Sequence, residues 1–249
     1  AETLRVMQIA QQVSEESGGA FDITVGPIVN AYGFGPQLTP TPPSDEALGA
    51  MREYVGRDKL ALDEAGLTAT KKDPRVYCDL SAVAKGYGTD AVSEYLEEQG
   101  VLNYMVEIGG EVRTRGTRPE GGAWSIGIER PDTVQQTVHL AVPMRSDGEP
   151  QSLATSGDYR NFFMEDGKRI SHTIDGRSGR PIEHMVASAS VLHTSCAWAD
   201  AYATALMALG PEEGMAMAER LGLSVYLLVR NADGSFDSRK SAAWPKGVG

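Results

Sequence analysis

The chain has 249 residues, of which 41% are apolar, and this is enough to bury a core in one large domain or two small ones. A disordered tail or a fibrous repeat is thereby excluded. The 34 acidic side chains outnumber the 23 basic ones and give a formal charge of −11, which opposes binding to nucleic acid or anionic lipid. We also expect no transmembrane span in this chain, because no apolar run approaches the roughly 18 residues that one needs. Residues 1–13 have the pattern of an amphipathic helix rather than of a signal peptide.

The first half of the chain alternates between helical and strand patterns. Apolar residues at helical spacing predict a helix over residues 2–17, which ends at Gly18-Gly19. The proline-rich stretch 36–44 predicts a loop, since proline disfavours both helices and central strands. The patterns that follow predict a helix over 45–55, strands over 59–62, 67–71 and 75–79, and a helix over 80–99.

The second half is richer in strands. β-Branched and alternating runs predict strands over 104–108, 112–115, 124–129, 137–142, 185–192 and 223–229. Residues 159–164 and 168–173 flank the turn sequence Glu165-Asp166-Gly167 and predict a hairpin. Helices are expected over 197–209 and 211–221, the second with Pro211 at its start. The sequence therefore predicts one α+β domain that could divide into two lobes, with a mixed, largely antiparallel sheet and flanking helices.

The strongest chemical signal is the pair Asp200 and Thr204. These residues are four apart, so on a helix their oxygens face one common point. The surrounding sequence is apolar, which predicts burial, and residues 181–219 contain neither Lys nor Arg. The partner of Asp200 must therefore come from another segment or be a bound ion. Carboxylate, hydroxyl and carbonyl oxygens suit Mg²⁺ or Ca²⁺, although an ion pair with a distant Arg or a capping role would explain Asp200 as well.

A second cluster spans residues 77–88, where a strand ends at Asp79 and a helix begins. Backbone amides at such a helix start favour an anion, and Lys85 could add a positive charge. Alternatively, Asp79 and Ser81 only cap the helix.

A third cluster contains Arg160 and His172. His172 could move a proton near neutral pH, and Arg160 could pair with a phosphate or a carboxylate. A hydrogen-bonded histidine in a sheet is the alternative for His172. Ser156 lacks the G-x-S-x-G frame of a serine hydrolase.

Read together and in this order, several segments resemble the ApbE family of FAD:protein FMN transferases. The matching segments are 19–27 (GAFDITVGP), 32–36 (YGFGP), 79–86 (DLSAVAKG), 108–110 (IGG), 155–161 (TSGDYRN), 171–175 (SHTID), 179–182 (GRPI) and 199–204 (ADAYAT). The resemblance covers nearly the whole chain, so residues 1–249 are expected to form the flavin transferase domain. Family members usually carry more chain before the first segment, and that N-terminal part is expected to be absent here.

The resemblance implies a set of site residues. Mg²⁺ would be held by the Asp200 carboxylate, the Thr204 hydroxyl and the Ala82 carbonyl. FAD would be bound by Ala20, Phe21, Asp22, Asp79 and the backbone near Ile174, with Lys85 or Arg160 near its phosphates. His172 and Asp200 would be the catalytic residues, with His172 or a nearby carboxylate accepting the proton.

The resemblance also implies a reaction and a place. A Thr or Ser hydroxyl of an acceptor protein would attack the flavin-side phosphorus of FAD, and AMP would leave. Two alternatives stay open: the site could hydrolyse FAD to FMN and AMP, or the protein could bind FAD without turnover. The family acts in the periplasm or on the outer face of the bacterial cytoplasmic membrane, often as a lipoprotein, and the same is expected here.

Overall fold

The computed structural model describes residues 1–35, 42–131, 137–158, 162–165 and 168–249. The helices are α1 (Glu2–Glu16), α2 (Gly26–Ala31), α3 (Asp45–Arg52), α4 (Ser81–Glu98) and α5 (Cys196–Leu221), with short 3-10 turns η1 (Ile23–Val25) and η2 (Arg57–Lys59). The strands are β1 (Leu60–Asp63), β2 (Thr68–Lys71), β3 (Tyr104–Ile108), β4 (Glu111–Arg115), β5 (Ser125–Glu129), β6 (Val138–Pro143) and β7 (Gln151–Gly157). They continue with β8 (Phe162–Glu165), β9 (Lys168–Ser171), β10 (Ile174–Asp175), β11 (Arg180–Pro181), β12 (Val186–His193), β13 (Ser224–Arg230) and β14 (Phe236–Lys240).

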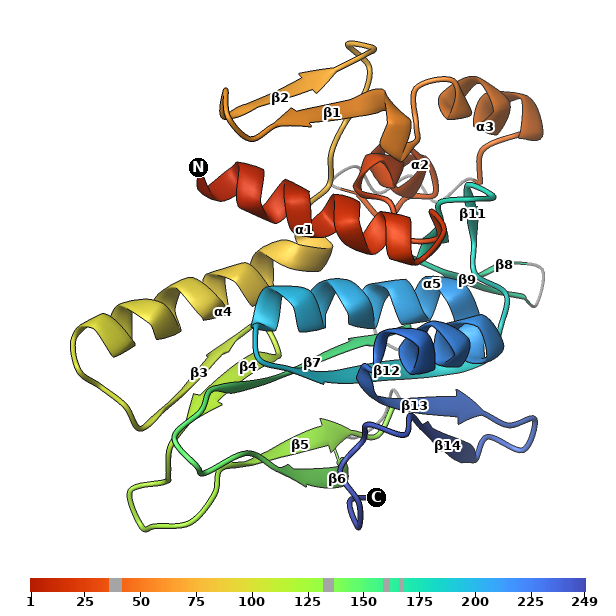
Figure 1. Cartoon of the computed structure of the whole chain (residues 1–249). Coiled ribbons are helices and arrows are strands. Elements are labelled where there is room, and N and C mark those ends of the chain that lie inside the picture. The colour runs from red at the N-terminus through yellow and green to blue at the C-terminus, as the bar shows by residue number, and fades with distance from the viewer. Residues whose placement is uncertain (36–41, 132–136, 159–161, 166–167) are drawn as a thin grey trace.

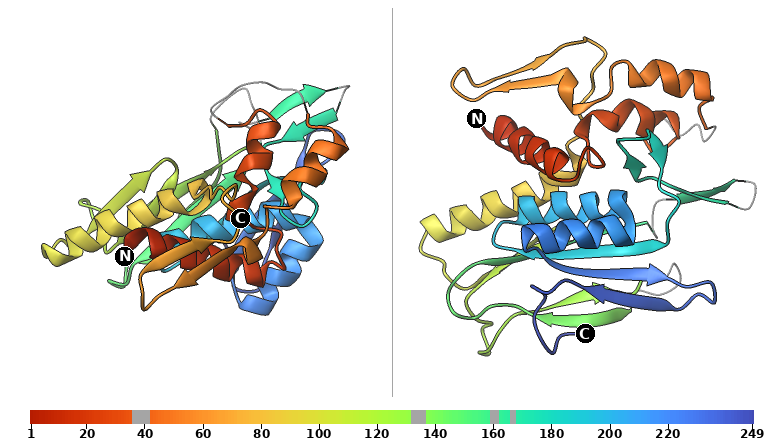
Figure 2. Two further views of the ribbon diagram at one scale, coloured as in Figure 1. Left: turned by 90° about the horizontal axis from the view of Figure 1, so that it is seen from above. Right: turned by 45° about the vertical axis from the view of Figure 1, so that its right-hand side comes forward.

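The largest sheet has six strands in the order β14-β13-β12-β7-β4-β3, and every neighbouring pair is antiparallel. Helices α4 and α5 lie over one face, and the β5–β6 hairpin lies on the other (Figure 1). Figure 2 shows the same layers from a second side, with α1, α2, α3 and the β1–β2 hairpin above the two long helices. This arrangement confirms the predicted α+β class with a largely antiparallel sheet.

The central strands carry apolar side chains on both faces of this sheet, which explains why both faces are covered. Successive side chains of a strand point to opposite faces. Val191 and Leu227 therefore face α5, whereas their neighbours Leu192 and Leu228 join a second cluster with Val142 of the β5–β6 hairpin. Both faces of the central strands are apolar, so both must be covered by another layer.

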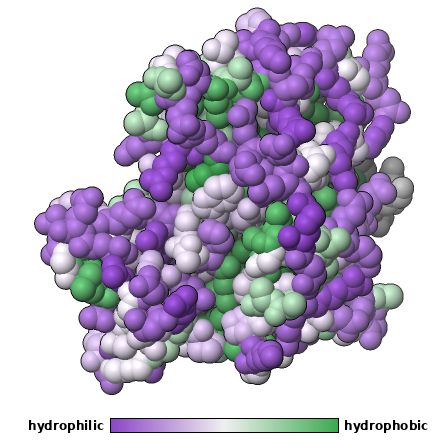
Figure 3. Space-filling model, viewed as in Figure 1, coloured by the Kyte–Doolittle hydropathy of each residue, from purple (hydrophilic) through white to green (hydrophobic). Residues whose placement is uncertain are grey.

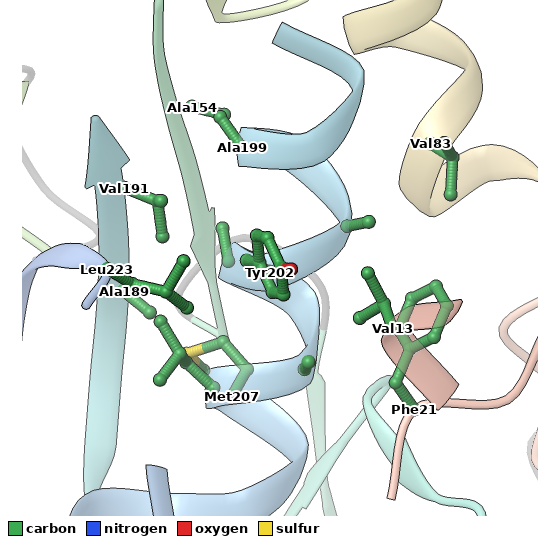
Figure 4. Close-up of a cluster of buried hydrophobic side chains, with 14 of the residues drawn as sticks. Val13, Phe21, Val83, Ala154, Ala189, Val191, Ala199, Tyr202, Met207 and Leu223 are labelled. Carbon is green, nitrogen blue, oxygen red and sulfur yellow. The ribbon is translucent and has the colours of Figure 1, made fainter. Parts of the chain in front are cut away.

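Helix α5 is buried on nearly all sides, as its apolar sequence predicts. Figure 4 shows Tyr202 and Met207 of this helix surrounded by side chains from β12, α1 and α4, among them Val191, Val13 and Val83. At Gly210 the backbone is not helical, with φ 80° and ψ −177°, and the second segment starts at Pro211. The two helices predicted over 197–209 and 211–221 are therefore confirmed, with the break where expected.

A third buried cluster stabilises the layer above the long helices. It is formed by Ile28 and Tyr32 of the α2 region, Leu48 of α3, Val55 and Ile174. This cluster fixes the segment 170–175 against the N-terminal part of the chain. It thereby positions two of the sequence segments that resemble the ApbE family.

Several expectations from the sequence are wrong. Residues 75–79 do not form a strand: Val76 to Leu80 have no regular secondary structure, and within this stretch the Asp79 N–H donates to the carbonyl of Ile23. Strands β7 and β14 and helix α2 were not predicted. The predicted loop falls partly on residues 36–41, which lie outside the described residues, and residues 42–44 belong to neither helix nor strand. The hairpin around Glu165-Asp166-Gly167 is confirmed by the antiparallel pairing of β8 with β9.

The surface of the molecule is largely hydrophilic on the side drawn in Figure 3. Hydrophilic residues cover most of the face drawn in Figure 3, and hydrophobic residues lie between them in smaller groups. None of the helices in the described ranges is long and apolar enough to cross a membrane.

Candidate functional site

A pocket of about 1010 Å³ lies where the N-terminal segment, α4, α5 and the sheet meet. Most of the residues that the sequence singled out are part of its wall. The predicted residues that line it are Ala20, Phe21, Asp22, Asp79, Ala82, Lys85, His172, Ile174 and Thr204. Asp200 lies behind Lys85, and Arg160 lies outside the described residues. A pocket of this size with convergent polar groups is typical of a small-molecule site.

Close packing of α4 against α5 positions the carboxylate of Asp200. A Cβ placed on Gly86 would lie 2.3 Å from the carbonyl oxygen of Cys196, so only glycine allows the two helices to approach this closely. The N–H of Gly86 donates to Asp200 Oδ2 over 3.0 Å. Asp200 is thus fixed against α4 at Gly86.

The cation that neutralises Asp200 is Lys85, from a segment 115 residues away. Its Nζ lies 3.2 Å from Asp200 Oδ1 and 3.2 Å from Glu111 Oε1. Burial raises the pKa of Asp200, although Lys85 and the N–H of Gly86 counteract this. Burial opposes the charge of Lys85 too, but the two carboxylates outweigh it and raise its pKa. The structure therefore contains the alternative that the sequence left open: Asp200 forms an ion pair with a distant cation, which is a Lys and not an Arg.

Glu111 at the start of β4 is a site residue that the sequence did not reveal. Its side chain is buried, and burial together with the charge of Asp200 raises its pKa from 4.5 to about 7. Its Oε2 has no hydrogen-bond partner among the described residues. The only signal in the sequence was its position directly after Gly109-Gly110, and a simple turn explains this glycine pair as well as a functional site does.

Thr204 lies one turn after Asp200 on α5 and faces the pocket. Its hydroxyl is 3.0 Å from that of Ser156 on β7. Thr204 and Ala82 both line the pocket, as does Lys85, the ion-pair partner of Asp200. In the part of the chain that the structure describes, no group of three or more His, Cys, Asp or Glu side chains could hold a metal. The predicted magnesium ligands are one carboxylate, one hydroxyl and one backbone carbonyl, so they differ from a cluster of three such side chains.

The segment Ala20–Asp22 forms the part of the wall near the N-terminus. The Ala20 carbonyl accepts a hydrogen bond of 2.9 Å from the N–H of Gly176. Asp22 accepts hydrogen bonds from the N–H and the hydroxyl of Thr24 and thereby caps η1. Burial nevertheless raises the pKa of Asp22. These contacts hold the segment next to the Ile174 strand.

Asp79 lies on the pocket wall and also contacts the start of α4. Its Oδ1 accepts a hydrogen bond of 2.9 Å from the N–H of Ser81. This is the local capping that the sequence offered as the alternative reading. The carboxylate therefore both orders the start of the helix and borders the pocket.

His172 follows the end of β9 in a bend, between β9 and β10. Its ring lies edge-on to Phe34, with centroids 6.1 Å apart, and Phe34 contacts Phe163. Phe34, Phe163 and His172 all line the pocket, so His172 borders an aromatic part of its wall.

Asp90, on α4, was also missed. Its carboxylate accepts hydrogen bonds from the Ser195 hydroxyl and from the N–H groups of Cys196 and Ala197. Arg113 donates to it over 2.6 Å. Asp90 thus caps the N-terminus of α5 from another helix and fixes the helix that carries Asp200.

Comparison with known proteins decides the family. The sequence matches the ApbE family over residues 1–227. The chain belongs to the ApbE family. The resemblance found in the sequence is thereby confirmed, and ApbE relatives with names and structures can be compared directly.

Among curated proteins, the chain is 44% identical over 247 residues to a protein of Vibrio cholerae serotype O1 named FAD:protein FMN transferase, covering 98% of this chain and 72% of that protein. A protein of the same name from Haemophilus influenzae is 42% identical, covering 99% of this chain and 71% of that protein.

Solved structures show the same fold. The flavin transferase ApbE from Vibrio cholerae superposes with a TM-score of 0.84 at 43% identity, over 98% of this chain and 76% of that chain. The apo form of the flavinyl transferase ApbE from Pseudomonas stutzeri gives 0.84 at 40% identity, over 96% and 72%. These similarities support an enzyme of the flavin transferase kind.

Proposed function

We propose that this protein transfers FMN from FAD to a Thr or Ser hydroxyl of an acceptor protein, in an Mg²⁺-dependent reaction that releases AMP. One observation carries the proposal. Segments far apart in the sequence, which the ApbE resemblance singled out independently of any structure, line the same pocket. Relatives named FAD:protein FMN transferase add further support.

In this proposal, the pocket binds FAD through two groups of residues that line it. Ala20, Phe21, Asp22 and the backbone at Ile174 lie on the N-terminal side, and Asp79 and Lys85 lie at the start of α4. The N-terminus of α4 carries the positive end of the helix dipole, which suits the diphosphate. Arg160 stays a candidate for the same role, outside the described residues.

The residues around Asp200 fit a magnesium ion. Asp200, Thr204 and the Ala82 carbonyl would supply hard oxygen ligands. Two buried carboxylates, Asp200 and Glu111, face one ammonium, and a carboxylate oxygen of Glu111 lacks a hydrogen-bond partner among the described residues. This surplus of negative charge favours a cation. When bound, Mg²⁺ would withdraw charge from the phosphate oxygens.

The remaining chemistry would come from side chains of this protein. The acceptor hydroxyl forms a bond to the flavin-side phosphorus, and the bond from that phosphorus to the bridging oxygen breaks, so that its electron pair leaves with AMP. His172, or a carboxylate on the same wall, takes the hydroxyl proton. The ammonium of Lys85 stabilises the negative charge of the departing phosphate.

Incubation of the protein with FAD and Mg²⁺, with and without an acceptor domain, separates this function from its alternatives. A transferase releases AMP and leaves flavin on the denatured acceptor. An FAD pyrophosphatase releases AMP equally in both tubes and leaves no flavin on the acceptor. No AMP in either tube would contradict the proposal and indicate a protein that only binds FAD.

The resemblance also leads us to propose that the protein acts in the periplasm, on the outer face of the cytoplasmic membrane. Fractionation of cells that express the full-length gene tests this. Recovery in the cytoplasmic fraction would contradict it.

A further inference from the structure

Lys85 is shared between two carboxylates that come from different elements. Its Nζ lies 3.2 Å and 3.3 Å from the two oxygens of Asp200 on α5, and 3.2 Å from Oε1 of Glu111 on β4. The same atom donates to the carbonyl of Ser81 over 3.4 Å. A single ammonium therefore connects α4, α5 and the start of β4 at the pocket wall.

The charges of this cluster are not balanced. The side chains of Asp200 and Glu111 are 2% and 4% exposed, whereas that of Lys85 is 40% exposed. Among the described residues, one positive charge thus faces two buried carboxylates. Glu111 Oε2 is buried without a hydrogen-bond partner among the residues that the structure describes, which is costly for a carboxylate oxygen.

The turn between β3 and β4 holds Glu111 in this position. Gly109 has φ +62°, and a Cβ there would lie 3.1 Å from Cδ of Lys85 and 3.7 Å from Glu111 Oε2. The glycine therefore lets the turn pass close over both side chains. Glu111 is placed by the backbone, while Lys85, with its flexible and more exposed chain, is the partner that can move.

A divalent cation on Asp200 changes this balance. The cation would repel the Lys85 ammonium, which contacts the same carboxylate. Lys85 would then either pair with another anion or compete with the metal for Asp200. Glu111 is the other carboxylate that contacts Nζ in the described structure. We propose that Glu111 is a positioning residue, which holds Lys85 away from Asp200 when a divalent cation binds and so leaves the Asp200 oxygens free to coordinate it. This inference rests on the metal site of the proposed function.

A double-mutant cycle tests the inference through metal binding, without reference to turnover. Isothermal titration calorimetry with Mg²⁺ alone, at pH 8, would compare the wild type with Glu111→Gln, Lys85→Gln and the double variant. We expect Glu111→Gln to weaken Mg²⁺ binding about tenfold, because Lys85 then stays on Asp200. Once Lys85 is replaced, the same change at Glu111 should alter binding less than about twofold. Glu98→Gln, an exposed change of the same charge on α4, is the matched control.

Any of the following results would overturn the inference. Glu111→Gln could bind Mg²⁺ as tightly as the wild type. Alternatively, the change of Glu111 to Gln could weaken Mg²⁺ binding by the same tenfold when Lys85 is already replaced, and this second result would mean that Glu111 acts by its charge alone. If the wild type itself binds no Mg²⁺, the metal site of the proposed function fails and the inference with it.

Thermal melting without metal checks that each variant is folded. If the Lys85 variants do not fold, Glu111→Asp replaces them: it keeps the charge but shortens the reach to Nζ, and wild-type binding by it would count against positioning.

Discussion

The carboxylate of Asp200 lies between the N–H of Gly86 and the ammonium of Lys85, at the junction of α4 and α5. If it holds Mg²⁺, Asp200→Ala should lower FMN transfer by about a hundredfold or more, because the charge that attracts the ion is lost. Asp200→Asn keeps the shape and removes only the charge, so it should lose a similar amount. Rates of AMP release over a range of Mg²⁺ concentrations measure both. Unchanged activity in either variant would refute the metal assignment.

His172 is expected to affect chemistry more than binding. It lines the pocket beside Phe34, and a group that accepts the hydroxyl proton contributes about a hundredfold to ten-thousandfold to a rate. His172→Ala should therefore still bind FAD, as followed by flavin fluorescence, while AMP release falls by that factor. Full activity of this variant would remove His172 from the mechanism and leave a carboxylate as the proton acceptor.

Glu111 should make the stability of the metal-free protein depend on pH. Its pKa is raised from 4.5 to about 7, so the folded state binds the proton more tightly than the unfolded state does. The resulting stability is present at low pH and is lost as the pH rises through about 7. Glutamine has no proton to lose. The free energy of unfolding of Glu111→Gln, relative to that of the wild type, should therefore rise by up to roughly 3 kcal/mol from pH 5 to pH 8.

Urea unfolding in EDTA at the two pH values measures this difference. An equal difference between wild type and variant at pH 5 and pH 8 would contradict the expectation. Together with weaker Mg²⁺ binding, a more stable variant would show that the buried charge serves the site at the expense of stability.

At this scale, the sequence revealed most of the site residues but not their partners. Asp200 and Thr204 could be paired from their spacing, because a helix brings residues four apart together. The contacts of Asp200 with Lys85 and Gly86 depend on how α4 packs against α5, which no local pattern contains. Asp90 and Glu111 looked like ordinary acidic residues, since only their burial and their contacts set them apart.

Among the elements, the contact between α4 and α5 is the one on which the site geometry depends. Gly86→Ala would place a Cβ 2.3 Å from the Cys196 carbonyl, so the helices must separate. We expect a loss of about 1 to 3 kcal/mol in the free energy of unfolding, together with weaker FAD turnover. Gly88→Ala, one half-turn on, is the control, because its Cβ would meet only Ile108 at an ordinary 3.5 Å. It should be neutral or stabilise the helix by up to about 1 kcal/mol.

Urea midpoints of the two variants decide this. Equal midpoints for Gly86→Ala and Gly88→Ala would mean that the helices do not need their close approach.

The elements also show where sequence patterns stop being informative. Strand β7 has the sequence QSLATSG, which has few of the β-branched and aromatic residues that indicate strands, yet it pairs with β12 and β4 in the middle of the sheet. Its small side chains fit because α5 packs closely over them. Residues 75–79 show the opposite case: their pattern indicates a strand, but in the structure they form a turn at Arg75 and an irregular segment after it. In both cases tertiary packing determined the outcome.

In the whole molecule, the candidate site lies where the layers meet. The N-terminal layer supplies Ala20 to Asp22, the helical layer supplies Lys85 and Thr204, and the sheet supplies Ser156 and Glu111. The fold class and the order of most elements could be predicted, because periodicity reports them directly. The way in which the layers close around one pocket could be inferred only through the ApbE resemblance, since it depends on contacts between distant segments.

Mass spectrometry of an acceptor domain tests the central claim most directly. The acceptor would be incubated with this protein and FAD, in Mg²⁺ or in EDTA, and then denatured. We predict that the acceptor gains the mass of one FMN on a Thr or Ser in Mg²⁺ and gains nothing in EDTA, with AMP formed in equal amount. An acceptor that gains no mass in Mg²⁺, or that is modified equally in EDTA, would contradict the account.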